Sequence, residues 1–118
     1  MHDSFKISLF DYDEISKDDL ISYYTIDLSL CKCAITLEQE INMIPAKESI
    51  NYPGKLYIKY QITEPGQEIF KSKEFNIDTL LVHIESFENI IPSNEYFCEV
   101  KTIDSFKSQI SKVFNDGI

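Results

Sequence analysis

The sequence predicts an all-β fold, an antiparallel β-sandwich of about seven short strands, on the basis of three observations. Several segments alternate apolar and polar residues with the period of two that turns one face of a strand toward a core. Turn-forming stretches such as "YPG", "EPGQ", "IPSN" and "NDG" separate these segments. Apolar residues almost nowhere recur at helical spacing, so we expect two packed sheets rather than a layer of helices.

The expected strands follow one another along the chain. In the first strand Phe5, Ile7 and Leu9 share one face, and in the sixth Tyr96 and Cys98 do so. One stretch, "AITLEQEI", has a spacing that is also compatible with one or two helical turns. The strand segments, in order, are "FKISLF" (5–10), "YTIDLSL" (24–30), "EINMI" (40–44), "KLYIKYQI" (55–62), "TLLVHI" (79–84), "EYFCEVKTI" (95–103) and "KSQISKVF" (107–114).

Composition limits the classes of partner. The 118 residues include 20 acidic and 11 basic side chains, which gives a net charge of −9 and a pI near 4.6. This charge argues against a nucleic acid partner and against a membrane surface recognised through clustered basic residues. Binding to an anionic lipid would therefore require an added cation.

The cysteines and the absence of targeting patterns favour a reducing compartment. Cys31, Cys33 and Cys98 form no disulfide framework, and "CKC" has no second pair to complete a metal site, so free thiols are expected. The start "MHDSFKISLF" is unlike a signal peptide, and the apolar runs are too short to cross a bilayer. We expect a cytoplasmic protein that meets membranes only conditionally.

No combination of residues supports catalysis. His2 and His83 are far apart in sequence and join no Ser/His/Asp or Cys/His arrangement. The three glycines do not form a phosphate-binding loop. We therefore expect a protein that is not an enzyme, with His83 half-buried in a sheet.

Five acids crowd the connection between the first two strands. Asp11, Asp13, Glu14, Asp18 and Asp19 fall within nine positions. Carboxylates this close repel one another, and a hard cation such as calcium binds six to eight oxygen ligands of this kind. A calcium ion among them would offset the repulsion, whereas the simpler alternative is an acidic loop surrounded by water.

Two other interpretations of this loop are less favoured. A helix–loop–helix calcium site numbered from Asp11 requires Gly and Glu where Ser16 and Ser22 stand. "ISLFDYDEI" also resembles the start of haloacid-dehalogenase-like phosphatases, with Asp11 as nucleophile and Asp13 as acid/base. Those enzymes alternate strands with helices, which the pattern here does not, and Ile15 stands where they usually have Thr or Val.

The stretch "LFDYDEISKDDLISYYTIDL" resembles the third calcium loop and flanking strands of the C2 domain family, the calcium- and lipid-binding domains found in synaptotagmins and protein kinase C. The resemblance implies a C2-like sandwich and calcium as the bound ion. Asp11, Asp13 and Asp19 match the three carboxylate positions, and Ser16 matches a further oxygen ligand. Asp18 is a fifth candidate ligand beside them.

The same resemblance implies how the loop would meet lipid. Ile15 matches the apolar tip that enters the bilayer, and Lys17 matches a flanking basic residue that contacts lipid phosphate. Ser22 departs from the family's glycine at its position. The implied function is calcium-dependent binding to an anionic phospholipid membrane. The alternative is a metal-free C2-like scaffold whose partners are proteins.

The resemblance also predicts an unusual domain organisation. Residues 1–62 resemble the C-terminal half of a C2 domain, 63–78 a connector, and 79–118 the N-terminal part of a second C2 domain. The two parts belong either to separate domains of a longer protein or to one permuted sandwich. In the permuted sandwich, Asn94 in "SNEYF" would replace an aspartate of the first calcium loop. Each lost carboxylate weakens a calcium site, so we expect weak binding by this chain alone.

Overall fold

A computed structural model describes residues 4–12, 18–29, 35–62, 74–77, 80–91, 94–102 and 108–111. All its regular elements are strands. In chain order they are β1 (Ser4–Asp11), β2 (Asp19–Asp27), β3 (Leu37–Asn42), β4 (Ile44–Pro45), β5 (Lys55–Ile62), β6 (Glu74–Ile77), β7 (Leu80–Glu88), β8 (Tyr96–Thr102) and β9 (Ser108–Ile110). The described residues contain no helix, and therefore none with the length and apolar character needed to span a membrane.

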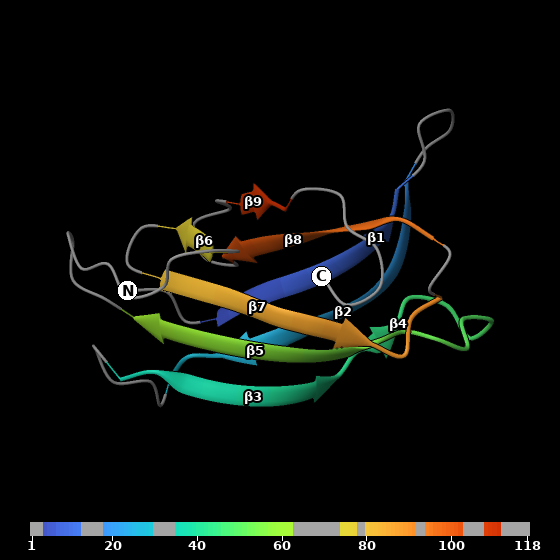
Figure 1. Ribbon diagram of the computed structural model, residues 1–118. Coiled ribbons are helices and arrows are strands. Elements are labelled where there is room, and N and C mark those ends of the chain that lie inside the picture. The colour runs from blue at the N-terminus through green and yellow to red at the C-terminus, as the bar shows by residue number, and fades with distance from the viewer. Residues whose placement is uncertain are drawn as a thin grey trace.

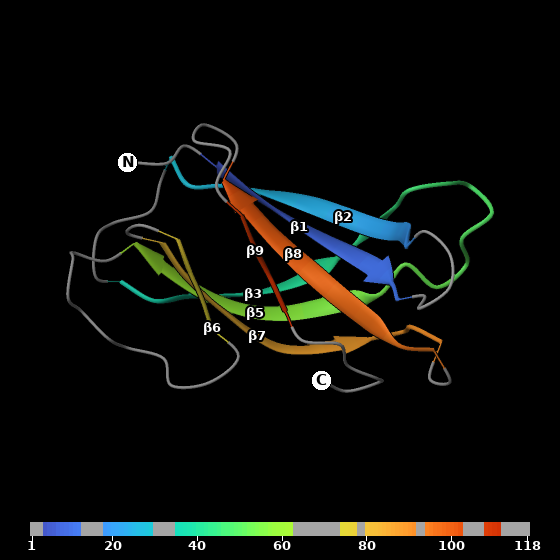
Figure 2. The ribbon, with the colours of Figure 1, turned by 90° about the horizontal axis from the view of Figure 1, so that it is seen from above.

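The strands form two antiparallel sheets that pack as a sandwich, which confirms the predicted fold class (Figure 1). Sheet A has the order β4-β2-β1-β8-β9, and sheet B the order β3-β5-β7-β6. Figure 2 shows the two layers crossing at an angle, as twisted sheets do when they pack face to face. Sheet A joins the start of the chain to a late segment, because β1 pairs with β8, whereas in sheet B the central pair is β5 with β7.

The core lies between the sheets and follows from the alternation in the sequence. Phe5, Ile7 and Leu9 of β1 are completely buried, as the period of two predicts. Phe5 also meets Tyr60 of β5 edge to face, with ring centroids 5.4 Å apart. The other inward-facing residues include Ile26, Leu28, Ile41, Met43, Leu56, Ile58, Ile62, Leu80, Val82, Ile84, Phe87, Tyr96, Cys98 and Val100.

Three details differ from the prediction. Residues 37–42 form strand β3 rather than helical turns, because they pair along their full length with β5. Strand β6 occupies 74–77, inside the stretch 63–78 that we expected to be a connector. Strand β2 begins at Asp19, earlier than predicted, because β1 offers it a partner as far as Asp11.

Two single residues agree with the sequence interpretation. His83 lies half-buried on β7, opposite Lys59 of β5. Cys98 is a free, fully buried thiol on β8. Cys31 and Cys33 fall outside the described residues.

Gly54 gives a first testable prediction. Its φ of +96° is strained for any other residue, and an added Cβ would lie 3.0 Å from Cγ2 of Ile90. We expect Gly54→Ala to lower the free energy of unfolding by about 1–3 kcal/mol, measured by urea denaturation. Asn89, at a φ of 56°, is the matched control: Asn89→Gly should be nearly neutral. Equal stability of Gly54→Ala and the unmodified protein would contradict the conformation described here.

Cys98 gives a second prediction. Burial raises the pKa of its thiol to about 12, an effect only partly opposed by the hydrogen bond with Ser111. In a Cys31→Ser/Cys33→Ser variant, a thiol reagent at pH 8 should therefore label Cys98 only after denaturation. Above about pH 9 the unfolded thiol loses its proton while the folded one keeps it, so stability should fall as pH rises toward 12. Cys98→Val should remove this part of the pH dependence, and rapid labelling of the folded protein would refute the burial.

Candidate functional site

The candidate site is the end of the sandwich where β1 meets β2. Asp11 is the last residue of β1, Asp19 is the first of β2, and their Cα atoms are direct partners across the ladder. A bulge sets this register: Leu9 pairs with Ser22 but Phe10 pairs with Leu20. Without the extra residue, Asp11 would face Leu20. The bulge therefore brings the two aspartates together on one face.

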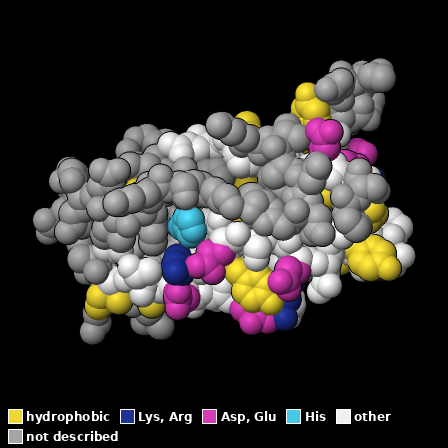
Figure 3. Space-filling model, in the orientation of Figure 1, with side chains coloured by type: hydrophobic (Ala, Val, Ile, Leu, Met, Phe, Trp, Pro, Cys, Tyr) yellow, Lys and Arg dark blue, Asp and Glu magenta, His cyan; other side chains and the backbone are white. Residues whose placement is uncertain are grey.

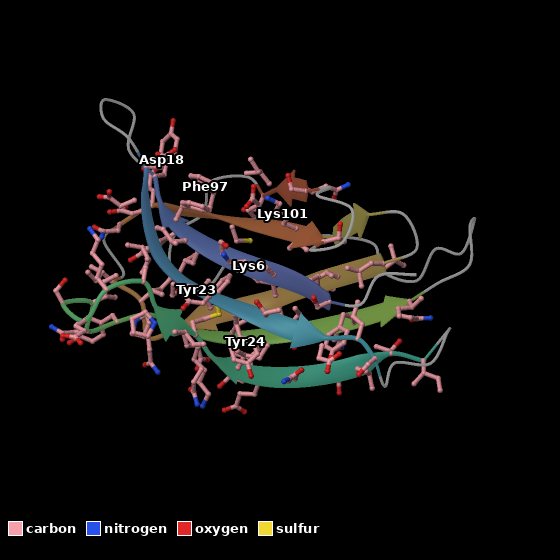
Figure 4. The ribbon with its side chains drawn as sticks, turned by 180° about the vertical axis from the view of Figure 1, so that it is seen from behind. Lys6, Asp18, Tyr23, Tyr24, Phe97 and Lys101 are labelled. Carbon is pink, nitrogen blue, oxygen red and sulfur yellow. The ribbon has the colours of Figure 1, made fainter. Side chains whose placement is uncertain are left out.

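Two carboxylates in directly opposed positions form an unfavourable cross-strand pair unless something lies between or beside them. Asp19 is exposed, whereas Asp11 and the adjacent Asp18 are partly buried and both take part in polar contacts. Figure 4 shows Asp18 at this end of the molecule. The remaining predicted residues of the loop, Asp13, Ile15, Ser16 and Lys17, lie outside the described part of the chain.

A second connection reaches the same end from the other side of β1. Asp11 is also the ladder partner of Tyr96 on β8, and the N–H of Tyr12 donates to the carbonyl of Glu95 at 2.9 Å. The segment that enters β8 is held in a tight turn: the N–H of Asn94 donates to the carbonyl of Ile91 at 3.2 Å. The end of β1 and the start of β8 are therefore neighbours.

The buried ring of Tyr96 fixes that second connection. Its hydroxyl accepts a hydrogen bond from the N–H of Ile91 at 3.0 Å and also contacts the carbonyl of Ile91 at 3.2 Å. The ring itself is inside the core, so a rigid side chain ties the turn at 89–95 to the position of Asp11.

Glu95 is an acid that the sequence interpretation did not include. It is exposed, and the Tyr12–Glu95 hydrogen bond holds its backbone beside the end of β1. In the stretch "SNEYF", the sequence predicts a ligand position only at Asn94. The pairing of β1 with β8 places the backbone of Glu95 beside the end of β1.

Within the described residues, no group of three or more acidic, cysteine or histidine side chains is arranged to hold a metal ion. The described part of this end supplies one opposed carboxylate pair; Asp18 precedes Asp19 in the chain, and the backbone of Glu95 lies beside Tyr12. Carboxylates of this kind are the ligands that calcium prefers, so the donor set is chemically suitable for it.

A different acidic surface lies on the outer face of sheet B, over β3, β5 and β7 (Figure 3). An open hollow of about 260 Å³ there is lined by Glu38, Gln39, Glu40, Tyr57, Ile58 and Glu85. Its carboxylates already have cationic partners: Lys59 lies 3.2 Å from Glu38 and 3.0 Å from Glu85, and Lys55 pairs with Glu40.

These ion pairs raise the pKa values of both lysines. Hydrogen bonds to Glu85 and then Glu38 are the main causes for Lys59, and the hydrogen bond to Glu40 is the main cause for Lys55. Lys55 and Lys59 thus offset part of the acidic charge on sheet B.

The outer face of sheet A differs again. Lys6 lies over the ring of Tyr23, 5.1 Å from its centroid, and Phe10 stacks on Phe97 with centroids 4.9 Å apart (Figure 4). Lys6 and Lys101 are ladder partners, so this face carries two basic residues in an otherwise acidic protein.

No family model matches the chain, and neither a curated protein nor a solved structure matches it. The likeness to C2 domains therefore stays a prediction from the sequence.

The opposed aspartates give a third prediction, in which the sign of the effect depends on calcium. In a chelator, Asp19→Asn should raise the free energy of unfolding by about 0.2–1 kcal/mol, because it removes a like-charge pair. In millimolar calcium the same variant should lose stability relative to the unmodified protein, because an ion stabilises the state that binds it. Thermal melting in both conditions measures the two effects.

The control for this comparison is Asp27→Asn at the other end of β2. A hydrogen bond from the N–H of Ser29 lowers the pKa of Asp27, so its carboxylate already has a stabilising partner. Asp27→Asn should bring no gain in a chelator and should not alter the response to calcium. A calcium response that is identical in Asp19→Asn and in the unmodified protein would exclude Asp19 as a ligand.

Proposed function

We propose that this protein is a non-catalytic module that binds anionic phospholipid membranes when calcium occupies the end formed by β1 and β2. The observation that carries the proposal is the register in which Asp11 and Asp19 oppose each other. The predicted ligands Asp13, Ser16 and Asp18 belong to the connection between these two residues, so they extend the same donor set. In the C2 family, which this stretch resembles, such a loop binds calcium.

Electrostatics explains why the ion would be needed. A chain with a net charge of −9 is repelled by an anionic lipid surface, and the repulsion acts over about 8 Å at physiological ionic strength. A calcium ion between Asp11 and Asp19 would cancel the charge of these two carboxylates and leave coordination positions for lipid phosphate oxygens. Ile15 and Lys17 would then contact the acyl region and a lipid phosphate. The ion supplies the attraction that the protein itself lacks.

Protein–protein contact is the second candidate function, and the outer face of sheet B favours it. The open hollow around Tyr57 is lined by polar and aromatic side chains that Lys55 and Lys59 already contact, so a protein partner would bind there by exchanging these exposed ion pairs for its own. Binding of this kind would not require calcium and would be unchanged by Asp11→Asn.

The fourth prediction tests the proposed function directly. Sedimentation with vesicles of phosphatidylserine and phosphatidylcholine should carry the protein into the pellet in millimolar calcium and leave it in the supernatant in a chelator. The variant Asp11→Asn/Asp19→Asn should lose most of the pelleting, because two of the carboxylates that hold the ion are gone. Asp27→Asn, which changes the charge of β2 at its far end, should pellet like the unmodified protein.

Pelleting that is equal with and without calcium would contradict the proposal, and so would the absence of pelleting in both conditions. Circular dichroism of each variant establishes that lost binding is not lost folding. A protein partner that binds equally in a chelator and to Asp11→Asn would favour the second candidate.

A further inference from the structure

We infer that a second membrane-contacting surface lies beside the acidic loop, formed by Ile44 and Tyr52 on the segment 43–54 together with Ile91. This inference rests on the proposed function, and it assigns lipid contact to a segment outside the acidic loop. The occupant is the interfacial region of an anionic bilayer. The three side chains are 43%, 58% and 44% exposed, and they are three of the five large hydrophobic side chains that are exposed among the described residues, the other two being Ile35 and Ile110.

Hydrogen bonds and ladder pairs place the segment 43–54 at the acidic end. Ile44 is the ladder partner of Tyr23, and the N–H of Ala46 donates to the carbonyl of Ile21 at 2.9 Å. The hydroxyl of Ser22 donates to the carbonyl of Pro53, next to Tyr52. The segment is therefore attached to the first residues of β2, which begins at Asp19.

Ile91 reaches the same end from β7. Its backbone is bound to the hydroxyl of Tyr96, and Tyr96 is the ladder partner of Asp11. The neighbouring Ile90 packs close to Gly54, so the turn after β7 contacts the end of the segment 43–54. In Figure 1 this segment, including β4, and the link from β7 to β8 lie together at the right-hand end. Hydrophobic side chains appear at the same end in Figure 3.

Charge distinguishes this surface from the rest of the molecule. The segment 43–54 contains one lysine and one glutamate, Lys47 and Glu48, and residues 89–91 contain no charged side chain. Both stretches are thus neutral in a chain of net charge −9. An anionic lipid surface repels the acidic faces but not this one, and exposed isoleucine and tyrosine side chains are suited to the interface between water and acyl chains.

The chain has no tryptophan, so a single introduced tryptophan reports its own depth in a bilayer. Ile44→Trp, Tyr52→Trp and Ile91→Trp are the test variants. Ile35→Trp is the matched control, because Ile35 is 49% exposed but precedes β3, whose first residue pairs with Tyr60 at the other end of the sandwich. Each variant is mixed with calcium and vesicles that contain phosphatidylserine and a phosphatidylcholine brominated on its acyl chains.

We expect the emission of the three test variants to shift to the blue and to fall on the order of twofold on binding, because bromine quenches only tryptophans that reach the acyl region. Ile35→Trp should pellet equally but keep its emission. Quenching of the control to the same degree, or no quenching of Ile44→Trp and Tyr52→Trp in protein that has pelleted, would overturn the inference while leaving the proposed function intact.

A double variant gives an independent measurement. Ile44→Ser/Tyr52→Ser alters two exposed side chains, so it should fold normally and bind calcium alone as the unmodified protein does in calorimetry. Its partition to vesicles should fall on the order of tenfold, because two apolar contacts with the bilayer are lost. Equal partition of the double variant and the unmodified protein would refute the proposed lipid contact. Calcium-independent self-association that disappears in this variant would also refute it, because a second copy of the chain would then cover this surface. If the unmodified protein does not pellet at all, both the proposed function and this inference fail.

Discussion

The central position of β1 is the constraint on which the rest of the structure depends. This strand pairs with β2 on one side and β8 on the other, so it joins two segments whose nearest residues, Asp27 and Tyr96, are 69 positions apart in the chain. Its inward-facing side chains are completely buried, and their burial fixes which face of the strand meets the core. A register slip of one residue would expose them, so the pairing is strongly specified. That pairing and the bulge after Leu9 determine the positions of Asp11 and Asp19.

Two groups of acids among the described residues lie in different environments. Those on sheet B lie beside Lys55 and Lys59, and the resulting pairs are exposed and weakly stabilising. Those at the β1–β2 end face one another across the ladder. Like charges in directly opposed positions lower stability unless a neighbouring group or a bound cation offsets them. The register at this end places two carboxylates of the kind that calcium prefers opposite each other, which is the physical basis of the proposed site.

The sequence predicts the strands in which apolar and polar residues alternate. It does not predict the conformation of segments that become strands by pairing with a distant strand. Phe5, Ile7 and Leu9 could be assigned to one face because a half-buried strand has that period. In "AITLEQEI", Leu37 and Ile41 are four apart and imitate a helix, yet as a strand they share a face, and contact with β5 settles the outcome. The local sequence pattern does not show which distant segments pair with one another. For that reason Glu95, held beside Tyr12 by a hydrogen bond from another strand, could not be placed at the site in advance.

Under the proposed function, the composition of the β1–β2 end makes membrane binding conditional. Two opposed carboxylates with a few neighbours hold calcium weakly without oxygen ligands from elsewhere, and lipid phosphates are such ligands. The exposed side chains of Ile44 and Tyr52 bury too little apolar area to anchor the protein unaided. Calcium coordination and apolar contact strengthen each other, because once one of them holds the protein at the membrane, the other forms as an intramolecular contact. Binding should therefore rise steeply when calcium and anionic lipid are present together and remain weak with either alone.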